Sequence, residues 1–158
     1  FGACMSPHTA FLILQGLETL SLRMEKHISN TREIVSFLNE HKEVKSVSYP
    51  ELENHPDNKL AQEILPRGCG AVFTFEIEGG LESGKKFIES LNIFSHLANV
   101  GDAKSLVIHP ASTTHHRMDT LALKNAGISE STVRLSIGIE DINDLKEDLD
   151  EALKQANR

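Results

Sequence analysis

The stretch that decides the fold is Ala71-Val-Phe-Thr-Phe-Glu-Ile-Glu78. Apolar and polar residues alternate along it, which predicts a strand whose apolar face carries Ala71, Phe73, Phe75 and Ile77. Alternation of period two is typical of an antiparallel strand that packs on one side and meets solvent on the other. The stretch therefore predicts an antiparallel sheet with its helices gathered on one face.

A second run, Thr132-Val-Arg-Leu-Ser-Ile-Gly-Ile139, alternates in the same way. Val133 and Leu135 would lie on its apolar face, and Arg134 on the opposite one. Shorter strand candidates occupy residues 44–49, 93–97 and 106–108, so we expect four or five strands in all.

Helical patterns fill most of the remaining chain. Ser6 is a good N-cap, Pro7 suits the first helical position, and apolar residues then recur at helical spacing. We expect a long helix to about Asn39, bent near Ser29-Asn30. Further helices are expected at residues 57–65, after Gly79-Gly80, at 119–125, and from Asp141 onward. The sum is an α+β domain preceded by a long helix.

Composition limits the classes of partner. The 158 residues fit one compact domain, and the formal net charge of −7 argues against nucleic-acid binding, which needs a basic surface. No apolar run is long enough to cross a membrane. Two cysteines, Cys4 and Cys69, form no disulfide framework, which favours a reducing cytoplasm.

The chain begins with Phe1 rather than Met, and no signal peptide follows. We interpret it as a fragment. Residues 1–40 would form a long inter-domain helix region, and residues 41–158 a small C-terminal α+β domain. The domain to which the helix leads would be absent from the chain.

Arg134 is the first candidate site residue. Its neighbours on the same strand face are small (Thr132, Ser136 and Gly138), which leaves room for a ligand. A guanidinium group can bind a carboxylate through two parallel hydrogen bonds. The alternative is a solvated arginine on an open sheet face, a common arrangement.

The loop from Ser95 to His115 is the second candidate. It concentrates short polar side chains and glycine, as an anion or a polar substrate would require: Asn99, Gly101, Ser112, Thr113 and Thr114. An ordinary connection between two strands is an equally good interpretation.

Three other signals are weaker. The eight histidines show no metal-ligand spacing, so no metal site is expected. Cys69, between two glycines, has no base beside it and is better explained as a small buried residue. Gly79-Gly-Leu-Glu-Ser-Gly-Lys85 fits a phosphate-binding P-loop, but Lys86 stands where Ser or Thr should bind Mg²⁺. We reject it as a nucleotide site.

Four blocks in order carry a resemblance to a known family: Gly16-Leu-Glu-Thr-Leu-Ser-Leu-Arg-Met-Glu25, Ala98-Asn-Val-Gly-Asp-Ala-Lys-Ser-Leu106, His109-Pro-Ala-Ser-Thr-Thr-His115 and Val133-Arg-Leu-Ser-Ile-Gly-Ile-Glu140. Together they resemble the C-terminal part of the Cys/Met-metabolism family of pyridoxal-phosphate enzymes. The second block is most similar to the O-acetylhomoserine sulfhydrylase branch.

The resemblance implies the small C-terminal domain of a fold-type I pyridoxal-phosphate enzyme. By the same resemblance, Arg134 would grip the α-carboxylate of the substrate, and Asn99 would contact it. Thr114, with Thr113 and His115, would lie at the mouth of the active site.

The implied reaction is γ-replacement, in which sulfide or methanethiol takes the place of acetate to give homocysteine or methionine. The full-length enzyme would use pyridoxal phosphate and assemble as a homotetramer. No segment resembles the family's cofactor lysine or its other cofactor-binding residues. We therefore expect no catalytic residue here, no cofactor bound to this chain alone, and no activity without the N-terminal cofactor domain.

Two alternatives stay open. The chain could be a free-standing, non-catalytic binding or regulatory module with the same fold. It could also belong to a cystathionine synthase or lyase type within the family. The sequence decides neither the sulfur nucleophile nor the choice between O-acetyl- and O-succinylhomoserine.

Overall fold

The computed structural model describes residues 3–156. Its helices are α1 (Pro7–Glu18), α2 (Leu20–Asn39), α3 (Asn58–Ile64), α4 (Gly80–Ser90), α5 (Thr120–Asn125) and α6 (Ile142–Ala156), with a short 3-10 helix η1 (Pro110–Ser112). Its strands are β1 (Val44–Ser48), β2 (Val72–Ile77), β3 (Ser95–His96), β4 (Leu106–Ile108) and β5 (Thr132–Ser136). The α+β class expected from the sequence is confirmed.

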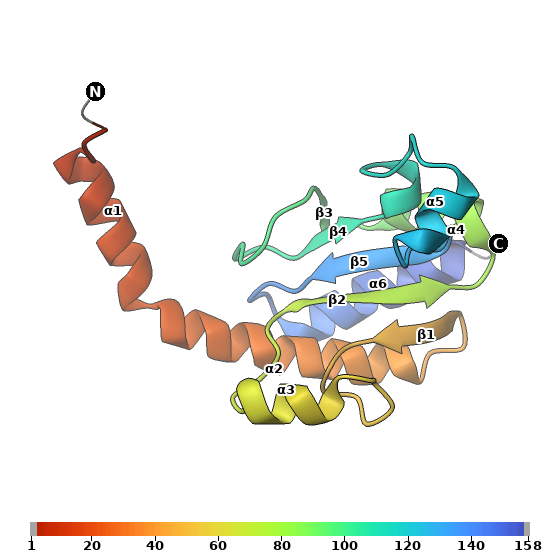
Figure 1. Cartoon of the computed structure of the whole chain (residues 1–158), viewed down its shortest axis with the longest axis horizontal. Helices are drawn as coiled ribbons and strands as arrows, with labels where there is room; N and C mark the ends of the chain where they lie inside the picture. The colour runs from red at the N-terminus through yellow and green to blue at the C-terminus, as the bar shows by residue number, and fades with distance from the viewer. Residues whose placement is uncertain (1–2, 157–158) are drawn as a thin grey trace.

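The strands form one five-stranded sheet in the order β1-β2-β5-β4-β3 (Figure 1). Neighbouring strands run antiparallel except β3 and β4, which pair in parallel. The expectation of a purely antiparallel sheet is therefore wrong, and the sheet is mixed. The reason lies in the segment 97–105, which doubles back after β3 so that β4 enters the sheet in the same direction.

One face of the sheet is covered by α2, α4 and α6, and the main core lies between them and the strands. The alternating residues of β2 and β5 supply the strand side of this core, including Phe75, Ile77, Val133 and Leu135. Leu145, Leu149 and Leu153 of α6 are fully buried against it. The amphipathic patterns thus predicted which side chains enter the core.

The long N-terminal helix is bent at a different place from the one expected. The break falls at Thr19, between α1 and α2, whereas α2 runs without interruption through Ser29-Asn30. Asn30 is 2% exposed, and its side chain donates to backbone carbonyls at the end of β5. This polar residue therefore serves a tertiary contact, and it does not mark a bend.

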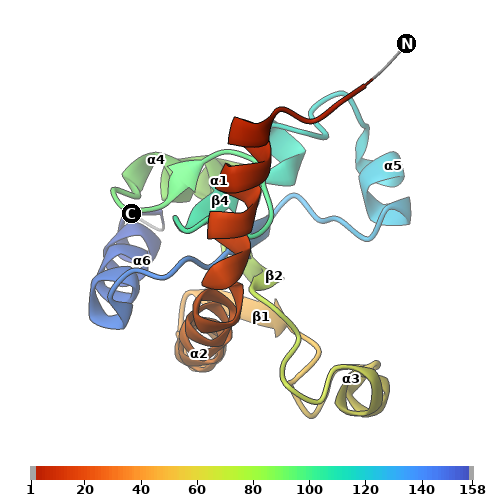
Figure 2. The ribbon, with the colours of Figure 1, turned by 90° about the vertical axis from the view of Figure 1, so that its left-hand side faces the viewer.

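Helix α1 projects away from the body of the molecule (Figures 1 and 2). None of its residues is buried, although half of them are apolar. Between residues 3 and 156, no helix is long and apolar enough to cross a membrane.

Candidate functional site

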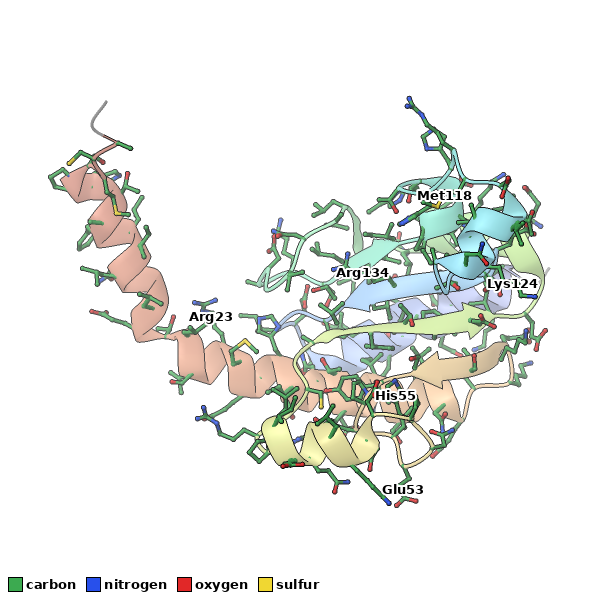
Figure 3. All side chains as sticks on the ribbon, in the orientation of Figure 1. Arg23, Glu53, His55, Met118, Lys124 and Arg134 are labelled. Carbon is green, nitrogen blue, oxygen red and sulfur yellow. The ribbon has the colours of Figure 1, made fainter. Side chains whose placement is uncertain are left out.

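Arg134 lies in the middle of β5, paired with Thr74 of β2 on one side and Ile108 of β4 on the other. Its strand neighbours Val133 and Leu135 are fully buried on the helix-covered face. Alternation therefore places the Arg134 side chain on the opposite face, where it is partly exposed. Figure 3 shows it beside the loop that leads into β4.

Within residues 3–156, the guanidinium of Arg134 makes a single hydrogen bond. Its Nη2 donates to the backbone oxygen of Asn99 at 3.3 Å. None of the ion pairs among residues 3–156 involves Arg134. Because a guanidinium carries five N–H donors, most of them are available to an incoming anion.

Asn99 meets Arg134 through its backbone and not through its side chain. Its Oδ1 accepts from the backbone N–H of Val100 at 2.8 Å, and its Nδ2 donates to Asp102 at 3.5 Å. The side-chain amide thus stabilises the exposed turn around Gly101. The structure brings the two sequence candidates together, with the Asn99 carbonyl as the group that orients the arginine.

Thr114 is not joined to this pair by a hydrogen bond. It is exposed, and its hydroxyl pairs with Nδ1 of His115 at 2.8 Å. The hydroxyl of Thr113 donates to the backbone oxygen of His109 at 2.8 Å. These residues form a turn-rich segment after η1, and their place at the mouth of an active site stays a prediction.

His109 anchors that segment, a role that was not among the sequence-based predictions. The ring is fully buried, its Nε2 donates to the backbone oxygen of Glu130, and its Nδ1 accepts from Ser112, both at 2.8 Å. Burial lowers the pKa of His109, against the opposing effect of its bond to Glu130, so the ring is neutral. Gly84 of α4 lies directly against it, because a Cβ there would come within 2.4 Å of Nε2.

Two sequence signals carry no site in the structure. Lys85, the lysine of the P-loop-like run, forms an ion pair at 2.7 Å with Glu82 in the same helix. Burial and the nearby Glu51 carboxylate raise the pKa of Cys69, which disfavours the reactive thiolate. Within residues 3–156, no group of three or more His, Cys, Asp or Glu side chains could hold a metal ion.

None of the lysines in residues 3–156 has surroundings suited to a Schiff base with pyridoxal phosphate. A lysine that forms a Schiff base must be desolvated and free of a fixed counter-charge. The lysines of residues 3–156 are exposed except Lys85 and Lys146, which are half-buried and are paired with Glu82 and Glu33 respectively. The lysines of this chain therefore do not fit the cofactor, whereas Arg134 has donors available to an anion.

Comparison with known proteins gives a consistent picture. The profile of the family described as Cys/Met metabolism PLP-dependent enzymes matches residues 1–154. An O-acetyl-L-homoserine sulfhydrylase from Leptospira meyeri is 49% identical over 97% of this chain, which spans 35% of that protein. An L-methionine gamma-lyase from Fusobacterium nucleatum is 40% identical over 98% of the chain, which spans 39% of it.

A crystal structure of a protein described as an O-acetylhomoserine (thiol)-lyase from Campylobacter jejuni has the same fold. It superimposes with a TM-score of 0.87 at 40% identity, over 97% of this chain and 36% of its own. That protein contains N'-pyridoxyl-lysine-5'-monophosphate, at a lysine outside the part that matches this chain. The chain spans about a third of the length of the relatives it matches.

Proposed function

Because this chain belongs to the family of Cys/Met metabolism PLP-dependent enzymes, we propose that it supplies the substrate-carboxylate half of an O-acetylhomoserine sulfhydrylase site. The observation that carries the proposal is Arg134. It is a partly exposed arginine on the face of the sheet away from the helices, with one donor fixed by the Asn99 carbonyl and no carboxylate partner among residues 3–156.

The proposed reaction replaces acetate on Cγ of O-acetyl-L-homoserine by sulfide or methanethiol. The Cγ–O bond breaks, a Cγ–S bond forms, and the product is homocysteine or methionine. The α-carboxylate does not react, so Arg134 contributes by binding and orientation. Two parallel N–H···O bonds would fix the direction of the Cα substituents, which lowers the entropic cost of reaching the reactive geometry.

The family is pyridoxal-phosphate-dependent. The residues that hold the cofactor would belong to a larger domain of the same protein, because this chain offers no suitable lysine. We propose residues 1–40 as the helical connection to that domain, residues 41–158 as the small domain, and a homotetramer as the complete assembly. On this view the chain by itself is inactive.

Helix α1 supports a large partner for this chain. Seven large apolar side chains of α1 and the start of α2 are at least 40% exposed: Phe11, Leu12, Ile13, Leu14, Leu17, Leu20 and Leu22. So many exposed large apolar side chains on one segment are typical of an interface. A groove of about 960 Å³ continues from them between α2 and residues 64–68. These surfaces favour the enzyme part over the free-standing module, which would leave them in water.

The test replaces Arg134 by Lys in the protein that carries this chain. We expect kcat/KM for O-acetyl-L-homoserine to fall about 100-fold, because lysine cannot form the two parallel hydrogen bonds that a guanidinium makes to a carboxylate. The matched control is Arg32→Lys in α2, which disrupts the two hydrogen bonds from Arg32 to Glu51. It should leave kcat/KM unchanged.

Two outcomes would contradict the proposal. An unchanged kcat/KM in Arg134→Lys would make the arginine structural only. Elimination from L-methionine in place of sulfhydrylation would assign the protein to the lyase type seen among its relatives.

A further inference from the structure

We propose that Glu140 is a positioning residue for the substrate-carboxylate site. The hydrogen bonds that its side chain accepts fix the end of the loop 97–104, and this keeps the Asn99 carbonyl within hydrogen-bond distance of Arg134. This inference rests on the proposed function, because it takes Arg134 as the group that binds the carboxylate. Glu140 itself touches neither substrate nor cofactor in this account.

Both oxygens of the Glu140 carboxylate accept hydrogen bonds from the same residue, Ser105. Oε1 accepts from the Ser105 backbone N–H at 2.6 Å, and Oε2 accepts from the Ser105 hydroxyl at 2.9 Å. Ser105 is fully buried, and its Oγ in turn accepts from the backbone N–H of Gly138 at 2.8 Å. Charge-assisted bonds of this kind are among the stronger ones in proteins.

Backbone contacts beside this pair also join the segment after β5 to the loop. The Ile139 N–H donates to the Ala103 carbonyl at 3.0 Å, which joins the chain after β5 to the loop. A Cβ on Gly138 would lie 2.5 Å from the Ala103 oxygen and 2.3 Å from Glu140 Oε2. Only glycine allows this approach, so the end of the loop has one well-defined position.

The middle of the loop has no comparable support. Val100 is 70% exposed, and the side chains of Asn99 and Asp102 bond only within the loop. In the part of the chain that the structure describes, the hydrogen bond from Arg134 to the Asn99 carbonyl is the one that links this turn to the sheet. The place of that carbonyl therefore depends on where residues 103–105 are fixed.

Glu140 is itself held by α2. Asn30 Nδ2 donates to the backbone oxygens of Gly138 at 3.1 Å and Glu140 at 2.9 Å. His27 Nδ1 donates to the backbone oxygen of Ile137 at 2.6 Å, from a ring that is 1% exposed. These carbonyls follow the last residue of β5, beyond the paired part of the strand. A continuous set of bonds thus leads from α2 through Glu140 and Ser105 to the loop beside Arg134.

The experiment uses Glu140→Gln in the protein that carries this chain, with two measurements. Calorimetry gives the affinity for L-2-aminobutyrate, an amino acid without a leaving group on Cγ, and for its amide, which lacks the negative charge. Hydrogen–deuterium exchange reports on residues 98–103. We expect the acid to bind about tenfold more weakly, the amide within about twofold of its original affinity, and exchange in the loop to accelerate.

The matched control is Glu51→Gln. Glu51 also accepts several hydrogen bonds, from Arg32, Tyr49 and the Cys69 backbone, but lies away from the loop. The Glu51→Gln variant should leave the ratio of acid to amide affinity unchanged. If Glu140→Gln does not fold, the same measurements are made on Ser105→Ala. This variant removes only the hydroxyl that links Glu140 to the Gly138 backbone, and its results are judged by the same criteria.

The positioning role is overturned if acid and amide affinities fall equally, or if exchange over residues 98–103 does not change. Failure of the proposed function gives a different result. In that case the unaltered protein already binds acid and amide alike, whereas the exchange measurement still decides whether Glu140 fixes the loop.

Discussion

Helix α1 and the second half of α2 are both rich in large apolar residues, yet only α2 uses them for the fold. Ile34 and Leu38 of α2 are fully buried against the sheet and α6. Leu14 and Leu17 of α1 are 60% and 55% exposed. The two helices are separated by a single residue, Thr19.

The difference shows that apolar content alone does not identify a core helix. The core of residues 34–156 is complete without α1, which contributes no buried residue to it. We therefore expect the apolar side chains of α1 to contact something outside this domain. If this view is correct, equal substitutions in the two helices should have unequal effects.

The largest effect is expected at Leu38. Leu38→Ala should lower the free energy of unfolding by about 3 kcal/mol, because it removes buried methyl groups and leaves a cavity. Urea denaturation monitored by circular dichroism measures the change. Leu38→Met, which keeps the volume, should cost less than about 1.5 kcal/mol. A loss below 1 kcal/mol for Leu38→Ala would mean that α2 is not part of the core.

A smaller effect is expected where the chain leaves α2. His41 Nε2 donates to Asp150 of α6 at 3.2 Å. The bond from Lys154, and then the one from His41, lower the pKa of Asp150 against the opposing effect of burial. A carboxyl whose folded-state pKa is lowered stabilises the protein above its unfolded pKa of about 3.9, and this contribution disappears as the pH falls through the folded value.

The free energy of unfolding of the original protein should therefore decrease between pH 5 and pH 3. In Asp150→Asn this decrease should be smaller by about 1 kcal/mol or less, since the pair is partly solvated. Thermal unfolding of both proteins at the two pH values provides the measurement. Identical pH dependence in the variant and the original would show that this link does not hold the end of α2.

The smallest effect on stability is expected in α1. Leu14→Ala should change the free energy of unfolding of this chain by no more than about 0.5 kcal/mol, because it removes no buried contact. The same chemical change at Leu38 is its internal reference. A loss of 2 kcal/mol at Leu14 would mean that α1 packs on this domain in solution, and the contrast between the helices would fail.

The sequence predicted those parts of the fold that depend on periodicity. Alternation in residues 71–78 and 132–139 identified β2, β5 and their buried faces. It did not predict the parallel pairing of β3, because a strand of two residues carries no pattern of its own. Nor did it place the helix bend, since Asn30 looks like a helix breaker until its partners at the end of β5 are known.

The candidate site was predicted in a similar, partial way. The face of β5 on which Arg134 lies follows from alternation, and the nearness of Asn99 from the resemblance to a family. The use of the Asn99 backbone, and the burial of His109, Ser105 and Asn30, depend on contacts between residues far apart in the chain. Such contacts leave no local signal.

The surroundings of Cys69 have a practical consequence for labelling. Burial and Glu51 raise the pKa of its thiol, whereas Cys4, just ahead of α1, is exposed. A maleimide dye at neutral pH should therefore attach first at Cys4, without any cysteine being removed by mutation. The natural sequence thus provides a fluorescent reporter beside the apolar helix, at the place where a partner would change its environment.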